Sequence, residues 1–373
     1  MTVLIFILIL SVLVIVHELG HFLMAKKQAV KVQEFGLGYP PLLAKLFSWR
    51  GTKFTLNAIP FGGFVKLEGE EYQPSDTNAS QVPGAFYAKS AWARVAVIFA
   101  GPLANILLAI LAFSIVFGIM GVPQSLANRP RINLVAPDSP AAKAGLSPND
   151  EIIGFKLFTD EVTTTNIDQV VEFIELNRGQ EVSIIFSGPC EGVVCPQERQ
   201  EAIVYLRTAD ETPVAEGSMG VAFADFYLQT GVWYDQLWRG IIYGLKEAMT
   251  LGILITSAVM KLFYELFTVG KVPLGIAGPV GIVHQASRSQ LLQSGWAPLL
   301  EFAGILSINL GIMNLLPIPA LDGGRILLVL MEKVVGKKRI QNIEGWVNYA
   351  GFLLLIGLIV IVSVRDIAQI FQT

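Results

Sequence analysis

The sequence predicts a polytopic α-helical membrane protein with four membrane spans, a membrane-associated β-hairpin and one soluble α+β domain. Three observations support this fold class. Of the 373 residues, 53% are hydrophobic and only 15% are charged, whereas soluble domains carry about 25% charged residues. Apolar runs recur along the chain, and several are long enough to cross about 30 Å of hydrocarbon as helices. A long stretch between the second and third of these runs is soluble in character.

The net charge of −3 gives no reason to expect nucleic acid as a partner, and the composition points to the lipid bilayer instead. Residues 2–16 are apolar without a break, and apolar residues continue to Met24. A secretory signal peptide is the alternative interpretation. It would need a basic start and a small-residue cleavage site, and neither is present. We therefore expect the first segment to remain in the membrane.

Seven segments are expected along the chain. In order, they are a first span (1–25), a hairpin and loop on the cytoplasmic side (26–90), a second span (91–122), a soluble domain (128–232), an amphipathic interfacial helix (235–269), a third span with the motif that ends it (296–325) and a fourth span (345–366). The hairpin is expected because strand-favouring residues at 43–49 and 53–59 flank a short glycine-containing turn.

The helix at 235–269 is expected to lie along the membrane surface. Its longest uncharged run, Ala248–Met260, has 13 residues, which is short for a span of about 20. Basic residues follow the first and the third spans, so the positive-inside rule places both of these regions in the cytoplasm. Four spans satisfy this pattern, with the soluble domain and both termini outside, whereas a crossing at 235–269 would move the later basic cluster outside.

The first span carries the pattern His17-Glu18-Leu19-Gly20-His21. Residues four apart share one face of a helix, so both imidazoles can reach the same ion. Imidazole ligands suit Zn²⁺, and a catalytic zinc keeps three protein ligands and an open position for water. Glu18 lies beside them and can accept a proton from that water. The alternative interpretation is that these polar side chains only form hydrogen bonds between spans. Ionisable groups inside a membrane, however, generally have a function.

A third ligand is needed, and the candidates are His284 and the acidic residues of the other spans, among which Asp322 is favoured. The third span ends at Pro317 and Pro319, which break the helix, and Asp322 follows them before two glycines. Because the first and third spans run in the same direction, Asp322 should emerge at the same leaflet as His21. His284 precedes the third span and is expected near the outer face as a loop histidine, which excludes it as a ligand unless 235–269 crosses the membrane.

Five motifs together resemble the site-2 protease family of intramembrane zinc metalloproteases, within it the bacterial regulator-of-sigma-E protease type with a PDZ domain. The resemblance covers nearly the whole chain. The motifs are HELGH (17–21), FGG (61–63), AGPLAN (100–105), SPAAKAGLSPNDEI (139–152) and NLLPIPALDGG (314–324). Residues 128–230 resemble one extracytoplasmic PDZ domain, where many relatives carry two. This domain could exclude bulky ectodomains or bind peptide tails.

The resemblance implies a role for each residue of the motifs. It assigns one Zn²⁺ to His17, His21 and Asp322, and the general base to Glu18. Substrate-binding roles fall to six further residues, Asn105, Asn314, Pro317, Pro319, Gly62 and Gly63. The hairpin at 43–68 would be a membrane-associated β element, and a strand edge at 53–59 or 61–68 could draw the substrate into extended form.

Cys190 and Cys195 are too few for a disulfide scaffold or a four-cysteine zinc site. They fall in an insertion between two strands of the soluble domain. The expected topology places them outside the cytoplasm, where a local disulfide is plausible. Two free structural thiols are the alternative.

The function expected from these residues is zinc-dependent hydrolysis of peptide bonds in the spanning segments of pre-cleaved, single-span membrane proteins, such as anti-sigma factors or remnant signal peptides. The enzyme would lie in the bacterial plasma membrane, with its active site near the cytoplasmic leaflet. A non-catalytic PDZ membrane scaffold is the main alternative, but a scaffold has no need of Glu18. A metal transporter would require more polar residues along the spans.

Overall fold

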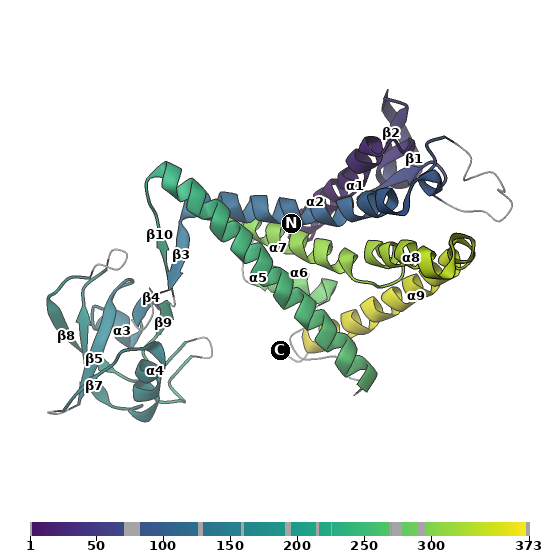
Figure 1. The fold of residues 1–373 in the computed structure, drawn as a ribbon. Coiled ribbons are helices and arrows are strands. Elements are labelled where there is room, and N and C mark those ends of the chain that lie inside the picture. Colours follow the sequence, from purple (N-terminus) through teal and green to yellow (C-terminus); the bar gives the residue numbers. More distant parts are fainter. Residues whose placement is uncertain are drawn as a thin grey trace. The chain divides into compact units, whose positions relative to one another are not determined.

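The structure is a computed structural model of the chain (Figure 1). It describes residues 2–70, 83–125, 130–157, 160–190, 195–213, 216–224, 226–268, 270, 278–288 and 295–370. The chain forms two compact units. The first comprises Met1–Ile119 and Leu237–Thr373, and the second comprises Met120–Gln236.

The first unit is built mainly of helices. In chain order they are α1 (Thr2–Lys27), the short 3-10 helix η2 (Phe86–Ala88), α2 (Ala91–Met120), α5 (Trp233–Thr268), α6 (Pro279–Arg288), α7 (Trp296–Leu315), α8 (Asp322–Val335) and α9 (Lys337–Ile370). The third apolar segment is therefore divided, because the helix ends at Leu315 and a new helix begins at Asp322. A break is expected there, since proline cannot donate a backbone hydrogen bond.

Five helices in the described part of the chain are long and apolar enough to cross a membrane, namely α1, α2, α5, α7 and α9. The four-span count is therefore not confirmed. The additional candidate is α5, where the sequence predicts an interfacial helix. Besides Asp235 and Arg239 near its start, the charged residues of α5 are grouped at Lys246–Glu247 and Lys261–Glu265. The apolar residues between these groups raise the hydropathy of the whole helix enough for it to qualify.

Small residues let the helices of this unit approach closely, as is common between membrane helices. A Cβ atom at Gly20 of α1 would lie 2.2 Å from the carbonyl oxygen of Ala100 in α2. A Cβ at Gly244 of α5 would lie 2.6 Å from the backbone nitrogen of Ser114, also in α2. The glycine inside the HELGH motif therefore brings α1 against α2, and this contact places the motif's histidines beside the second helix.

Two long bent strands, β1 (Val32–Trp49) and β2 (Thr52–Leu67), pair in an antiparallel manner and meet at Trp49 and Thr52. The turn lies where the sequence predicts it, but the first strand begins at residue 32 rather than 43. Each strand is bent, so each contributes two segments. From one edge of the sheet to the other, these segments lie in the order 42–49, 52–57, 34–37, 63–67.

The sheet has two end segments, 42–49 and 63–67, and among the described residues 63–67 pairs only with β1. Residues 53–56, by contrast, have a partner on each side. β2 also contacts α1, which is the helix that carries the HELGH motif (Figure 1). The free edge of the sheet and the polar turn of α1 therefore belong to the same part of the first unit.

The second unit contains a sheet of strands β4 (Arg131–Val135), β5 (Glu151–Leu157), β6 (Asp160–Thr163), β7 (Glu181–Ser187), β8 (Arg199–Tyr205) and β9 (Val221–Ala224), in the order β8-β7-β5-β4-β9 with β6 beside β5. Helices α3 (Pro140–Lys143) and α4 (Ile167–Leu176) accompany the sheet, and β3 (Val122–Ser125) pairs with β10 (Phe226–Gln229). Its core includes Ile132, Phe155 and Ile184, each fully buried.

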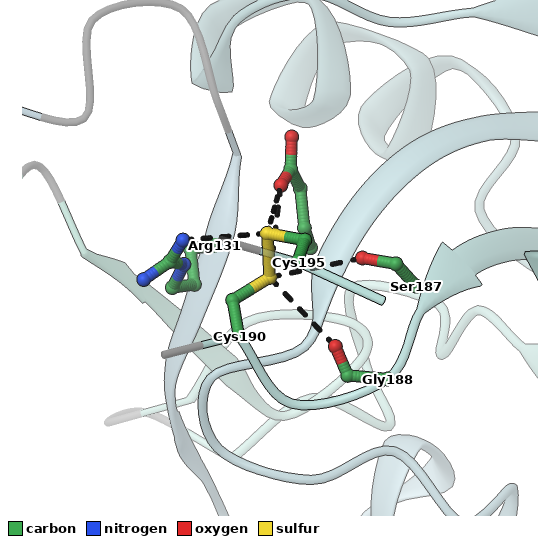
Figure 2. The surroundings of a disulfide bond; sticks show 6 residues. Arg131, Ser187, Gly188, Cys190 and Cys195 are labelled. Atoms are coloured by element: carbon green, nitrogen blue, oxygen red, sulfur yellow. Dashed lines mark hydrogen bonds between the residues drawn. A yellow bond between two sulfur atoms is a disulfide. The ribbon is translucent and has the colours of Figure 1, made fainter. Parts of the chain in front are cut away.

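Cys190 and Cys195 form a disulfide in this unit, which decides between the two alternatives left open by the sequence (Figure 2). Arg131 donates a hydrogen bond to Cys195 Sγ at 3.5 Å, and Cys190 Sγ lies 3.8 Å from Ser187 Oγ. Glu151 Oε2 lies 2.7 Å from Cys195 Sγ. The disulfide thus joins two residues of the segment that follows β7, and it lies beside Arg131, the first residue of β4.

Candidate metal centre and active site

Helix α1 presents both histidines of the motif on one face, as the four-residue spacing requires. Their Nε2 atoms lie 3.1 Å apart. Asp322, the first residue of α8, brings its Oδ2 to 3.0 Å from His17 Nε2 and 3.4 Å from His21 Nε2. The structure therefore brings together the three residues that the sequence suggests as zinc ligands, although about three hundred residues separate them.

The turn before α8 determines where Asp322 lies. Ala320 adopts a positive φ of 73°, and its backbone nitrogen donates to Asn348 Oδ1 of α9 at 3.3 Å. A Cβ atom at Gly323 would lie 2.2 Å from the carbonyl oxygen of Leu315, and one at Gly324 would lie 2.3 Å from that of Ile318. The two glycines thus let α8 begin directly against the end of α7, which no larger residue would permit.

The geometry of these three donors fits a tetrahedral zinc ion. Zinc bonds of about 2.0–2.2 Å at tetrahedral angles place neighbouring donor atoms about 3.3 Å apart, and the three separations here are 3.0, 3.1 and 3.4 Å. Asp322 Oδ2 is buried, and with both Nε2 atoms left unprotonated for metal it has no hydrogen-bond donor among the described residues. A buried carboxylate oxygen without such a donor is costly, and a metal ion bound there would satisfy it.

Each imidazole has a partner for its other nitrogen. An imidazole that binds metal through Nε2 carries its proton on Nδ1 and needs an acceptor for it. For His21 this is the carbonyl oxygen of Val97, at 2.9 Å. For His17 it is the side-chain amide of Asn105, whose Nδ2 lies 3.3 Å from Nδ1 and whose Oδ1 has no other partner in the described part of the chain. Rotation of this amide by about 180° exchanges Nδ2 and Oδ1, and Oδ1 can then accept the proton on His17 Nδ1.

Gly101 of α2 forms the wall behind the two histidines. A Cβ atom at this position would lie 2.3 Å from His21 Nε2 and 2.9 Å from His17 Nε2. Any side chain here would therefore occupy the space of the metal-binding nitrogens. Sequence reasoning placed Gly101 within the AGPLAN motif but gave it no role, because only the packing of α1 on α2 brings it to the metal centre.

Glu18 helps to line a small cavity of about 190 Å³, and the three donor residues line the same cavity. The Val65 backbone N–H interacts with the Glu18 carboxylate, and a Cβ atom at Gly63 would lie 3.9 Å from Glu18 Cγ. Residues 63–65 belong to the end segment of the β-sheet. The acid–base candidate therefore lies between the metal ligands and the free strand edge.

Sequence reasoning missed the ion pair that bounds this cavity. Arg325 lies one turn after Asp322 on α8. Its Nη2 is 2.8 Å from Glu70 Oε1, and its Nε is 4.0 Å from Glu344 Oε1. Burial by itself would lower the pKa of Arg325, but the Glu70 carboxylate beside it raises the net pKa above the ordinary value. The guanidinium is therefore a permanent cation. Arg325 follows the LDGG motif directly in the sequence, and this was the only signal that could have identified it.

The remaining predicted residues occupy varied positions. Asn105 is fully buried behind His17, and Asn314 lies in the last turn of α7. Pro317 is exposed in the turn before α8, whereas Pro319 packs against Gly351 of α9. Gly62 adopts a positive φ of 74°.

His284 lies on α6, and the group of described residues able to share a metal at this site contains His17, His21 and Asp322 without it. The sequence predicts a loop position for His284, and this prediction is wrong, because Pro279–Arg288 form a helix.

Comparisons with known proteins agree with this chemistry. The model of Peptidase family M50 matches residues 5–358. A candidate zinc metalloprotease of Clostridium acetobutylicum is 31% identical over 375 residues, covering 97% of this chain and 96% of the relative. Zinc metalloprotease RasP of Oceanobacillus iheyensis is 29% identical over 448 residues, covering 99% of both chains. With its donor geometry and its acid–base candidate, the chain belongs to Peptidase family M50 and is a zinc metalloprotease of the site-2 type.

Proposed function

We propose that this enzyme hydrolyses peptide bonds within the membrane-spanning segments of single-span proteins that another protease has already shortened. Anti-sigma factors and remnant signal peptides are substrates of this kind. The observation that carries the proposal is the position of the donor set, because His17 and His21 lie within an apolar helix long enough to cross a membrane. The metal cavity, at about 190 Å³, is too small for a folded chain.

The residues of the site divide the chemistry between them. A zinc ion held by His17, His21 and Asp322 would act as a Lewis acid and lower the pKa of water toward about 7. Glu18 accepts a proton from the attacking water and delivers it to the departing amine. Asn105 and the Val97 carbonyl hold the imidazoles in the tautomer that leaves Nε2 free for metal.

The substrate reaches this site in extended form, because a helix hides the peptide group that water must attack. The end segment 63–67 of the β-sheet supplies the strand edge to which it pairs. This segment is preferred to 53–59, since residues 53–56 already have a partner on each side. The edge runs past Glu18, so a paired peptide would pass the metal ligands.

A proline at position 65 tests this strand pairing. Backbone groups alternate in direction along a strand, and the Val65 N–H faces Glu18 rather than β1. Val65→Pro is therefore expected to leave the β1–β2 pairing in place while removing one edge donor, which is also the contact to Glu18 and so lowers cleavage of every substrate to some extent. Cleavage of a stable helical substrate should fall more than cleavage of the same substrate with a helix-breaking Gly-Pro pair beside the cleaved bond. Equal losses for both substrates would contradict strand pairing.

The second unit is proposed to be one extracytoplasmic PDZ domain covering 128–232, which excludes substrates with bulky ectodomains. Its disulfide supports this placement, because disulfides persist outside the reducing cytoplasm. The proposed location is the bacterial plasma membrane, with the metal centre near the cytoplasmic leaflet. With α5 lying along the membrane surface, the basic residues that follow α1 and α8 fall on the same side and support that orientation. The contact of Asp322 with His17 and His21 requires the same arrangement.

Removal of zinc tests the activity directly. The purified enzyme in proteoliposomes is expected to lose cleavage of a co-reconstituted single-span substrate when a chelator strips the metal, and to regain it with one equivalent of Zn²⁺ per chain. Metal analysis of both preparations checks the stoichiometry. Full cleavage by the metal-free enzyme would rule out the proposed chemistry.

A further inference from the structure

A second cavity, of about 670 Å³, adjoins the metal cavity. The two cavities share four lining residues, Phe64, Val65, Glu70 and Arg325. The Glu70–Arg325 ion pair, with its 2.8 Å separation, thus forms part of the wall between them. The volume falls within the range of about 300–1,000 Å³ that is usual for ligand sites. The catalytic role of Glu18 and the zinc donors does not require a space of this size.

The walls of the second cavity indicate what it holds. One wall is the end segment of the β-sheet, through Phe64, Val65 and Lys66, which is the edge proposed to pair with substrate. A second part of the lining comes from α9, through Gln341, Glu344, Gly345, Asn348 and Phe352. A peptide strand paired with the edge beside Glu18 would continue into this cavity.

We propose that the second cavity binds the part of the substrate that continues from the cleaved bond on the cytoplasmic side, in extended form and with polar side chains. The proposal rests on the proposed function and adds a specificity site to it. Lys66, Gln341 and the Glu70–Arg325 ion pair line the cavity. A polar side chain can form hydrogen bonds with these groups, whereas an apolar side chain would displace their water without replacing its hydrogen bonds. The segment of α9 that lines the cavity follows Lys337, Lys338 and Arg339, which mark the cytoplasmic side.

Two glycines of α9 allow a matched test. A Cβ atom at Gly345, which lines the cavity, meets nothing within 4 Å, and the same is true at Gly357, which does not line it. A phenylalanine at either position can therefore be introduced without a backbone clash, and both replacements remove a glycine from a helix interior. Gly345→Phe places its ring in the cavity, whereas Gly357→Phe serves as the control for added bulk on the same helix.

The experiment compares two substrates in proteoliposomes. One is a single-span protein with its natural cytoplasmic segment, and the other ends a few residues past the cleaved bond. Gly345→Phe is expected to lower kcat/KM for the long substrate by about tenfold or more, with little change for the short one. Gly357→Phe should match the unmodified enzyme on both. Zinc content should be unchanged in both variants.

Three results would overturn the proposal. Normal cleavage of the long substrate by Gly345→Phe would show that the cavity is not occupied by substrate. An equal loss for both substrates would indicate a route for water instead. A preference for apolar over polar residues in the cytoplasmic segment would contradict the assigned chemistry. The proposed function fails separately, since it requires zinc dependence in the unmodified enzyme whatever the Gly345 variant does.

Discussion

Replacement of Glu18 by glutamine is expected to lower the cleavage rate by about 10²–10⁴-fold, because general acid–base groups contribute on that scale. Glutamine keeps the size of the side chain and can still accept a hydrogen bond from the Val65 N–H, but it cannot take a proton from water. His17, His21 and Asp322 are untouched, so one zinc ion per chain should remain bound. Single-turnover cleavage of a single-span substrate, combined with metal analysis, separates these two effects.

The zinc content is the control in this experiment. A Glu18→Gln enzyme that has lost its metal would report damage to the site rather than loss of the proton acceptor. A variant that retains zinc and cleaves at the original rate would show that another group accepts the proton. Accumulation of uncleaved substrate on the zinc-loaded variant is the expected outcome, and it would also allow bound substrates to be identified by mass spectrometry.

Replacement of Gly101 by alanine is expected to abolish both zinc binding and cleavage. The added methyl group would lie 2.3 Å from His21 Nε2 and 2.9 Å from His17 Nε2, well inside van der Waals contact. Helix α2 itself should tolerate the change, since alanine is favoured over glycine in helices by about 1 kcal/mol. The damage should therefore be confined to the metal centre, and it is measured by zinc stoichiometry and substrate cleavage.

Gly118→Ala on the same helix is the matched control. A Cβ atom there would lie 4.0 Å from Leu237 Cδ1, which is ordinary contact. This variant should bind one zinc ion and cleave normally. A Gly101→Ala enzyme with full zinc content and activity would mean that the two imidazoles do not face Gly101 in the working enzyme, and the geometry of the centre described above would be wrong.

Local periodicity explains what could be predicted about the site. The pairing of His17 with His21 follows from the 3.6 residues in each helical turn. A separation of four residues is enough to place both imidazoles on one face of the helix. The break before Asp322 follows from two prolines that cannot continue a helix. Placing Asp322 and His21 in the same leaflet required one more step, which was to count the membrane crossings between them. The positions of the basic residues gave that count.

Features that depend on packing were not predictable in the same way. Gly101 and Arg325 carry no periodic signal, and their roles appear only when α2 and α8 are brought against α1. The order of the sheet segments likewise depends on the bends in β1 and β2, which move 63–67 to the edge and 52–57 to the interior.

The sequence by itself determined that this chain is a membrane protein with a zinc-binding helix, because hydrophobic runs and helical spacing are properties of neighbouring residues. Only the tertiary structure decided which surfaces close around that helix. The 3.0–3.4 Å donor geometry, the Gly101 wall, the free strand edge and the second cavity all arise from contacts between segments far apart in the chain. Such contacts depend on the shape complementarity of packed side chains, which no short stretch of sequence encodes.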